Sequence, residues 1–346
     1  PAPRRAAGER SAEVVNVLVT GGAGYIGSVS VEILLDAGHS VVVFDNLSRG
    51  HRPAVDARAR FIEGDLCDPA AVAAAFAGER FDAVMHFAAF ALVGESMQRP
   101  EMYWRNNVGG GLNLIEAMRA HGVRRIVFSS TCATYGLPER VPIDEDLPQR
   151  PANPYGESKL MLETMLRWYE RLHGFQPVFL RYFNACGATA RFGEDHEPET
   201  HLVPNILRVA LGRMPELPVY GNDYDTLDGT CIRDYIHIRD LADAHLRALQ
   251  SERTGAFNLG QGSGFSVLEV VEAARAVTGH PIPIRFEPRR PGDPPRLVAA
   301  SDRARAILGW QPRHSNLRRI LEDAWAWHRA HPNGYSDTAS RPTSGT

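Results

Sequence analysis

Cysteine, lysine and long apolar runs are all scarce in this chain of 346 residues. The four cysteines, Cys67, Cys132, Cys186 and Cys231, are too widely spaced for a CxxC pair or a cysteine metal cluster, and too few to crosslink a chain of this length. A reducing, cytoplasmic setting is therefore expected. No apolar run approaches the roughly 18 residues needed to span a bilayer, so the sequence predicts no membrane-spanning segment.

Charge of either sign is nearly balanced, with 38 basic against 41 acidic residues and a formal net charge of −3. Such a balance offers no basic surface for nucleic acid or an anionic membrane, and neither partner is expected. Lys159 is the single lysine, and the other basic residues are arginines. An isolated lysine indicates a position where the bulk and permanent charge of arginine would not serve.

Apolar runs of strand length alternate with segments of helix length through the first half of the chain. Their hydrophobicity is continuous, which is typical of strands buried on both faces of a parallel sheet. We therefore predict an α/β fold with a doubly wound parallel sheet covered by helices. The predicted strands are 15–20, 40–44, 60–63, 83–87, 125–129 and 176–181.

The alternation weakens after Arg181, where proline and glycine interrupt shorter helical segments. We predict a nucleotide-binding domain over 14–184 and a smaller, loop-rich α/β region over 185–332, from which some segments return to the sheet. Helices are expected at 103–121 and 154–174, and later at 202–211, 241–250, 267–278 and 317–330. The ends, 1–13 and 333–346, are small and polar, and we expect a leader without a secretory signal and a disordered tail.

A glycine-rich turn joins the first strand to the helical segment that begins at Ser28. Gly21, Gly24 and Gly27 follow the spacing GxxGxxG, which lets the backbone approach a pyrophosphate at a helix N-terminus. The second strand ends at Asp45, whose carboxylate would accept hydrogen bonds from ribose hydroxyls and repel a 2′-phosphate. The pattern favours NAD over NADP. The alternatives are a ligand-free turn and an Asp45 that caps a helix.

Two further strand ends point to the same cofactor. Asp65 follows the third strand where an adenine would lie, although it is equally suited to cap a helix that begins at Pro69. Phe87 and Ala88 follow the fourth strand and fit a second turn near the phosphates.

A candidate catalytic set follows the fifth strand, which ends in Ser129, Ser130 and Thr131. Tyr155 and Lys159 are spaced i, i+4, so they share one face of a helix. We expect the Lys159 ammonium and a cationic nicotinamide together to favour the Tyr155 phenolate as a general base. Lys159 would also reach the nicotinamide ribose, while Thr131 orients the reacting oxygen. The alternative is a surface tyrosine with no such role.

Together with these motifs, the segments DNLSRG, LRYFNACGA, DGTCIRDYIHIRDLADAH and PRRPGDPPRL resemble the extended short-chain dehydrogenase/reductase family, and within it the UDP-hexose 4-epimerases. The resemblance covers 17–327. It implies a Rossmann fold, bound NAD, a UDP-sugar substrate and a homodimer formed through 103–121 and 154–174. The implied reaction interconverts UDP-glucose and UDP-galactose by oxidation at C4 and return of the hydride to the other face.

The same resemblance implies contact residues. For NAD they are Gly21, Gly24, Tyr25, Ile26, Gly27, Asp45, Asn46, Asp65, Leu66, Phe87, Ala88, Asn106, Ser129, Tyr155, Lys159 and Tyr182. For the UDP-sugar they are Thr131, Tyr155, Asn184, His201, Leu202, Tyr220, Arg233, Arg290, Asp293 and Leu297. Leu297 is expected to gate the pocket for the 2-substituent; the alternative is that it packs in the core.

Departures from the family pattern separate related activities. The 4,6-dehydratases carry an Asp-Glu pair after the strand-end threonine, where this chain has Cys132 and Ala133, so elimination is disfavoured. Remaining alternatives are 4-epimerisation of UDP-arabinose or xylose, UDP-glucuronate or a UDP-N-acetylhexosamine, a net dehydrogenase and a non-catalytic NAD sensor. His196, His201 and His237 are expected to be scattered, without HExxH or CxxC companions, and no metal site is predicted.

Overall fold

The computed structural model describes residues 14–290 and 292–335, so the predicted leader and the tail from 336 onward lie outside the described residues. A seven-stranded sheet forms its centre, in the order β11-β6-β5-β4-β1-β2-β3. All of its pairings are parallel. The strands are β1 Asn16–Thr20, β2 Ser40–Asp45, β3 Arg60–Glu63, β4 Ala83–His86, β5 Arg125–Thr131, β6 Gln176–Tyr182 and β11 Gly255–Leu259.

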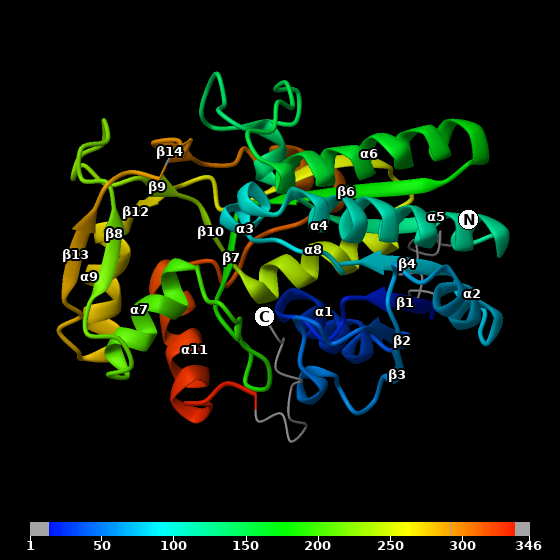
Figure 1. The fold of residues 1–346 in the computed structure, drawn as a ribbon, viewed down its shortest axis with the longest axis horizontal. Coiled ribbons are helices and arrows are strands. Elements are labelled where there is room, and N and C mark those ends of the chain that lie inside the picture. The colour runs from blue at the N-terminus through cyan, green and yellow to red at the C-terminus, as the bar shows by residue number, and fades with distance from the viewer. Residues whose placement is uncertain (1–13, 291, 336–346) are drawn as a thin grey trace, which may run out of the picture.

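Helices cover both faces of this sheet, because nearly every side chain of its inner strands is buried and most of them are apolar. On one face, α1 (Tyr25–Asp36) and α8 (Ile238–Gln250) share a core with the sheet. On the other, α2 (Pro69–Ala77), α5 (Gly110–Ala120) and α6 (Pro154–His173) do the same (Figure 1). The predicted doubly wound parallel fold is confirmed.

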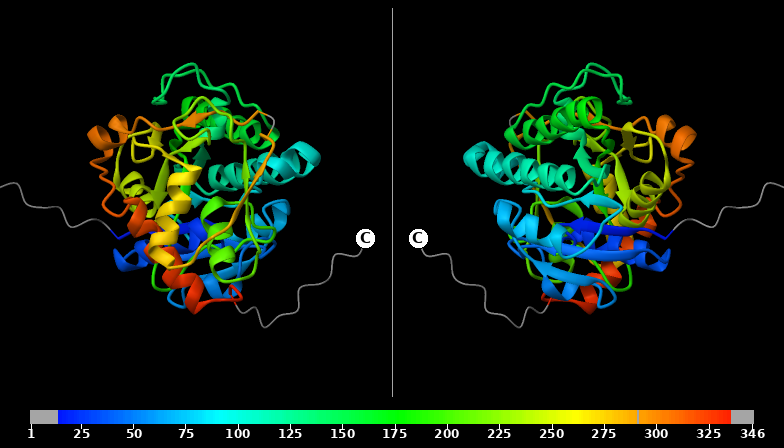
Figure 2. Two further views of the ribbon diagram at one scale, coloured as in Figure 1. Left: turned by 90° about the vertical axis from the view of Figure 1, so that its left-hand side faces the viewer. Right: turned by 90° about the vertical axis from the view of Figure 1, so that its right-hand side faces the viewer.

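A second, smaller region lies at the carboxyl end of the sheet and has a core of its own. Its helices are α7 (Leu202–Ala210), α9 (Val267–Thr278) and α11 (Leu317–Ala330), the last shown in red in Figure 2. Short strands form three small sheets: β13 (Ile284–Glu287) with β8 (Leu217–Tyr220); β12 (Phe265–Ser266), β9 (Ile232–Arg233) and β14 (Arg296–Leu297); and β10 (Tyr235–His237) with β7 (Asn184–Cys186).

Short elements complete the chain: η1 (Arg52–Ala54), α3 (Val93–Gln98), α4 (Pro100–Tyr103), η2 (Trp104–Gly109), η3 (Cys132–Tyr135) and α10 (Asp302–Leu308). The helix predicted over 103–121 is interrupted, because η2 is a π-helical segment between α4 and α5. Its wider turn carries Asn107 inward, where the amide bonds Phe90 and Ser158. Within the described residues, no helix has both the length and the apolar character of a membrane span.

The disordered tail predicted from residue 333 is wrong for 333–335. Tyr335 packs its ring on Trp327 at 5.2 Å between ring centroids, and its amide donates to Asp195 at 2.8 Å. The sequence suggested a polar tail because one aromatic residue among small ones carries no periodicity.

A buried ion pair joins α6 to the sheet. Two guanidinium nitrogens of Arg181, on β6, donate to the Glu163 carboxylate, Nε at 2.9 Å and Nη2 at 2.6 Å. Ser130, at the end of β5, donates to the same carboxylate at 2.6 Å. Arg181 also donates to Tyr135, which donates to Asn258 on β11. Because Glu163 and Arg181 are both fully buried, this network fixes α6 against three neighbouring strands.

Glu163→Gln should lower the free energy of unfolding by about 3 to 5 kcal/mol, because it leaves the Arg181 charge buried without its counter-ion. Replacing both residues with leucine should recover most of that loss, since no unpaired charge then remains. Urea unfolding of the two variants and the wild type measures both changes; a loss below about 1 kcal/mol in Glu163→Gln would show that the pair is not a stabilising constraint.

Candidate active site

The turn between β1 and α1 has the form of an anion cradle. Gly21 adopts a φ of +76°, and a Cβ there would lie 2.4 Å from the backbone nitrogen of Ala88. A Cβ on Gly27 would lie 2.1 Å from the carbonyl oxygen of Gly21. No described side chain caps α1 at Gly24. The same holds for α3, α4, α5, α7 and α10, whereas α2, α6, α8, α9 and α11 have side-chain caps. The first amides of α1 are thus left for a ligand such as a pyrophosphate.

Asp45 closes this turn from the neighbouring strand. Its carboxylate accepts the Ala23 amide at 3.0 Å and the Leu47 amide at 2.8 Å, so it caps no helix. Burial raises the pKa of Asp45, although these two hydrogen bonds oppose the rise. The carboxylate belongs to the glycine-rich turn, where a ribose would pass.

The end of β3, where an adenine is expected, lies beside the same turn. Asn46 donates to Asp65 at 3.0 Å, and Asp65 also accepts the Cys67 amide. Asp68, not Asp65, caps α2, which removes the capping alternative for Asp65. Leu66 is buried beside this loop. Phe87 and Ala88 follow β4, and their amides donate to the carbonyl of Thr20.

Lys159 is a buried cation for which the described residues supply no carboxylate. Its Nζ donates to the carbonyl of Ser129 at 2.8 Å and lies 4.9 Å from the centroid of the Phe128 ring. Burial lowers the pKa of Lys159 to about 7. A charge held in this way without a counter-ion is costly for stability, which indicates a functional position.

Tyr155 lies one turn before Lys159 on α6. Burial raises the pKa of its phenol to about 12, and the Thr131 hydroxyl opposes the rise. The expectation that Lys159 and a cationic nicotinamide together favour the phenolate remains a prediction, and in the chain by itself the phenol is protonated at neutral pH. The physical reason is that burial raises the energy of both charged forms, so the ammonium and the phenolate are disfavoured together.

The residues around this pair are tied to one another. Ser129 and Tyr182, on adjacent strands, share a short hydrogen bond between their hydroxyls. Asn106 donates to Asn107, whose amide reaches Ser158 on α6 at 2.9 Å. Asn107 was missed at the sequence level, because nothing in an NNV segment shows that a π-helical turn buries the second asparagine rather than the first.

Most of the predicted substrate residues also gather near this site. Arg233 donates to Asp293 at 2.5 Å and pairs in register with Leu297. Leu297 packs with Cys132 against one small apolar cluster, next to Thr131. Arg290 lies 4.0 Å above the Tyr220 ring. The Asn184 amide donates to the carbonyl of Asp234 at 2.9 Å, which places it beside Arg233.

His201 and Leu202 lie at the start of α7, and His201 contacts residues other than those just described. His201 contacts Glu194 and Glu199, at 2.8 and 3.1 Å between its Nδ1 and their oxygens. His196 joins the same group, so the prediction that these histidines are scattered is wrong for His196 and His201. His237 is separate and contacts Asp323.

Tyr25 connects this group to the cradle. Its ring packs edge-on against His196, with 6.2 Å between ring centroids, and its hydroxyl donates to the carbonyl of Gly187. The Tyr25 side chain therefore points toward the second region, and its backbone is the part that faces the glycine-rich turn.

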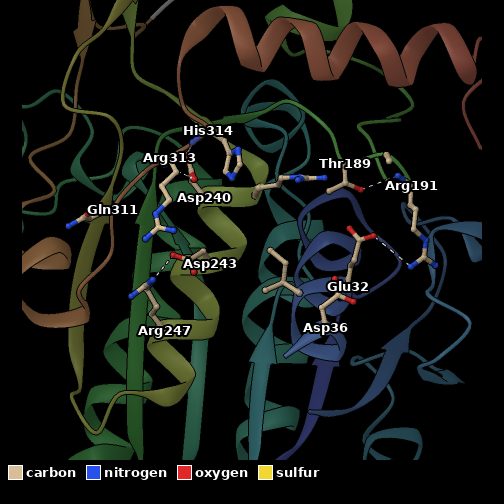
Figure 3. A pocket seen from close by; sticks show the side chains of 13 residues that line it. Glu32, Asp36, Thr189, Arg191, Asp240, Asp243, Arg247, Gln311, Arg313 and His314 are labelled. Carbon is tan, nitrogen blue, oxygen red and sulfur yellow. Dashed lines mark hydrogen bonds and ion pairs between the residues drawn. The ribbon is translucent and has the colours of Figure 1, made fainter. Parts of the chain in front are cut away.

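A separate pocket lies between α1 and α8 and contains none of the predicted site residues (Figure 3). Its charged side chains largely neutralise one another, as in the Arg247–Asp243 pair at 2.6 Å and the Arg191–Glu32 pair at 3.6 Å. The chemistry is concentrated instead at the carboxyl ends of β1, β2, β4 and β5.

Comparison with known proteins agrees with this geometry. Residues 17–260 match the NAD dependent epimerase/dehydratase family. The sequence is 52% identical over 329 residues to the UDP-glucose 4-epimerase of Lacticaseibacillus casei, covering 93% of this chain and 99% of that protein.

Solved structures share both the fold and much of the sequence. The UDP-glucose 4-epimerase from Brucella ovis in complex with NAD has a TM-score of 0.87 and 47% identity, covering 90% of this chain and 98% of that one. The enzyme from Bifidobacterium longum in complex with NAD+ and UDP has a TM-score of 0.89 and 38% identity, covering 92% and 100%.

Lys159→Met should stabilise the nucleotide-free protein at neutral pH by about 1 to 3 kcal/mol while abolishing catalysis, because it removes an unpaired buried charge. Since the folded-state pKa is lowered to about 7 from 10.5, the unfolded chain binds more protons between these values. Wild-type stability therefore rises with pH across this window, and the advantage of the variant should shrink.

Urea unfolding at about pH 7 and about pH 9.5 tests this expectation. A Lys159→Met variant that is less stable than the wild type at both pH values would contradict it.

Proposed function

The chain belongs to the NAD dependent epimerase/dehydratase family, and we propose that it is a UDP-glucose 4-epimerase that interconverts UDP-glucose and UDP-galactose. The observation that carries the proposal is the set of Thr131, Tyr155 and Lys159 at the end of β5, followed by Cys132 and Ala133 in place of an acid pair. The cradle at Gly21 and Gly27, the uncapped α1 and the unpaired Lys159 all fit a bound dinucleotide.

Each residue of the catalytic set has a distinct task. Tyr155 takes the proton from the 4-hydroxyl of the sugar and returns it, while Thr131 hydrogen-bonds the same oxygen and orients it. Lys159, anchored on the Ser129 carbonyl, holds the nicotinamide ribose. A bound NAD would supply the hydride acceptor and donor for C4 of the sugar, and its cationic ring would supply the charge that favours the Tyr155 phenolate.

Elimination is disfavoured by the residues that follow Thr131. Burial raises the pKa of the Cys132 thiol to about 12, so it remains protonated at neutral pH. Ala133 carries no proton-transferring group. With no second acid or base in this turn, the 4-keto sugar has no route to lose water, and hydride return is the productive step.

One region holds the cofactor and the other holds the nucleotide part of the substrate. Residues 14–184 hold NAD through the cradle, Asp45 and Asp65, and residues 185–332 hold the uridine diphosphate. Arg233 and Arg290 suit forked contacts with phosphate, and Asp293, bonded to Arg233, suits a ribose hydroxyl. Tyr220 and Leu202 would flank the uracil, and Arg290 lies over the Tyr220 ring.

A homodimer through α5 and α6 is part of the proposal. These helices contact each other on the outside of the molecule. They expose Leu112, Met161, Trp168 and Leu172, of which Trp168 is 54% and Leu172 68% accessible. Large apolar side chains gathered on one helical face are typical of a surface that a partner covers.

The proposed function is tested by incubating the purified protein with UDP-galactose and no added cofactor. Anomeric-proton NMR should show UDP-glucose, and denaturation of the protein should release NAD. A stoichiometric demand for external NAD, accumulation of free NADH, a 4-keto-6-deoxy product or no conversion would reject the proposal. Parallel samples with UDP-arabinose and UDP-glucuronate decide between the hexose and the other 4-epimerases.

Tyr155→Phe should lower turnover about 10²- to 10⁴-fold, because it removes one hydroxyl and with it the general base. Bound NAD and the far-UV circular dichroism should match the wild type, which serves as the check on folding. A variant that keeps more than about a tenth of wild-type turnover would show that another group is the base.

Leu297→Tyr tests the size of the sugar pocket. With Leu297, UDP-N-acetylgalactosamine should be a slow substrate, since an apolar mismatch discriminates by only about 1 to 3 kcal/mol. A tyrosine at this position should reduce turnover of the acetylated sugar about tenfold or more and spare UDP-galactose. An equal loss on both substrates would mean that Leu297 is a packing residue of the Cys132 cluster.

A further inference from the structure

One cluster of titratable side chains takes no part in the proposed reaction. Glu194, His196, Glu199 and His201 follow the spacing ExHxxExH in the loop between β7 and α7. Each residue turns one nitrogen or oxygen toward a common point, and these four atoms lie within 4.8 Å of one another. We propose that this loop binds a first-row divalent transition metal, with Zn²⁺ as the expected occupant.

The separations between donors scatter around the spacing of a tetrahedral site. Nδ1 of His196 lies 3.3 Å from Glu194 and 3.7 Å from Glu199, and Nδ1 of His201 lies 2.8 and 3.1 Å from the same two carboxylates. Zinc bonds of about 2.0 to 2.2 Å to imidazole and carboxylate place neighbouring ligands about 3.3 to 3.6 Å apart. The 3.3 Å separation lies in this range and the 3.7 Å one just above it, whereas the two contacts of His201 are shorter and would lengthen around a metal. Two imidazoles with two carboxylates are a ligand set that zinc accepts.

An unsatisfied atom points to the same conclusion. Nδ1 of His196 is buried and makes no hydrogen bond to any described residue, because the nearest carboxylate oxygens are too distant or poorly aligned. Buried ring nitrogens are normally paired, so this one needs an explanation. A metal at the common point would satisfy it together with the other three donors.

Charge is consistent with a divalent ion. With neutral imidazoles, the two carboxylates leave the cluster at −2, which one divalent cation neutralises. The competing occupant is a pair of protons. Burial alone would lower the pKa of both histidines. The neighbouring Glu194 and Glu199 outweigh it and raise the pKa of His196 to about 9 and that of His201 to about 10. A metal would therefore displace two protons, and the experiment must distinguish the metal from the protons.

The surroundings hold the donors in place. The amides of Thr200 and His201 both donate to Glu199 at 2.7 Å, which fixes that carboxylate. Tyr25 packs against His196, and Asp195 is tied to Tyr335. A metal here would fasten the start of α7, where His201 and Leu202 are expected to meet the UDP-sugar. The effect on the UDP-sugar contacts rests on the proposed function. The amount of metal that the protein binds does not depend on that function.

The test measures metal in the untagged, full-length protein after incubation with Zn²⁺ and exhaustive dialysis. Mass spectrometry of the elements should find about one equivalent of zinc, or of another first-row divalent metal, per chain. Glu194→Gln and His196→Ala should retain less than a tenth of this amount. His280→Ala removes an exposed histidine far from the cluster in sequence and should bind as the wild type does.

Wild-type protein that retains less than a tenth of an equivalent would overturn the proposal and leave two protons as the occupants. Equal metal in the wild type and both cluster variants would also overturn it, since the metal would then bind elsewhere. Because a cluster variant could fail to fold, Co²⁺ is added to metal-free wild type as an independent measurement. Strong visible absorption typical of four-coordinate cobalt supports the site, and its absence overturns it.

Discussion

The ion pair between Arg181 and Glu163 is the constraint on which the arrangement of the site depends. Both side chains are buried, so separating them would leave a charge without a partner in a low-dielectric interior. The pair and its bond to Ser130 prevent α6 from sliding along β5 and β6. Lys159 and Tyr155, one and two turns earlier on α6, are thereby held against Ser129 and Thr131.

Around this fixed frame, the protein leaves particular groups unsatisfied where ligands are expected. Lys159 lacks a described carboxylate, and α1 lacks the side-chain cap that five other helices have. Each of these features lowers the stability of the ligand-free chain and favours binding of a dinucleotide. The raised pKa of Tyr155 has a related cause, because burial disfavours the phenolate and the chain alone does not supply a cation that would stabilise it.

The two regions are joined by segments that alternate between them. β11 returns from the second half of the chain to the edge of the main sheet, and its Asn258 enters the network of Arg181 through Tyr135. The loop that carries Glu194 to His201 packs on Tyr25 of the glycine-rich turn. Movement of the proposed uridine diphosphate contacts relative to the NAD cradle is therefore restricted from two sides.

The sequence by itself determined those parts of the protein that depend on local spacing. The glycines from Gly21 to Gly27 require a close backbone approach, and Tyr155 and Lys159 share a face because four residues make one helical turn. Only the tertiary structure decided that Asn107 rather than Asn106 is buried, that Tyr335 is ordered, and that Glu194, His196, Glu199 and His201 converge. It also decided that the phenol of Tyr155 has a raised pKa. Burial is set by atoms distant in the chain. The spacing ExHxxExH is local, but it lies in a loop with no regular periodicity, so the sequence does not show that the four side chains meet.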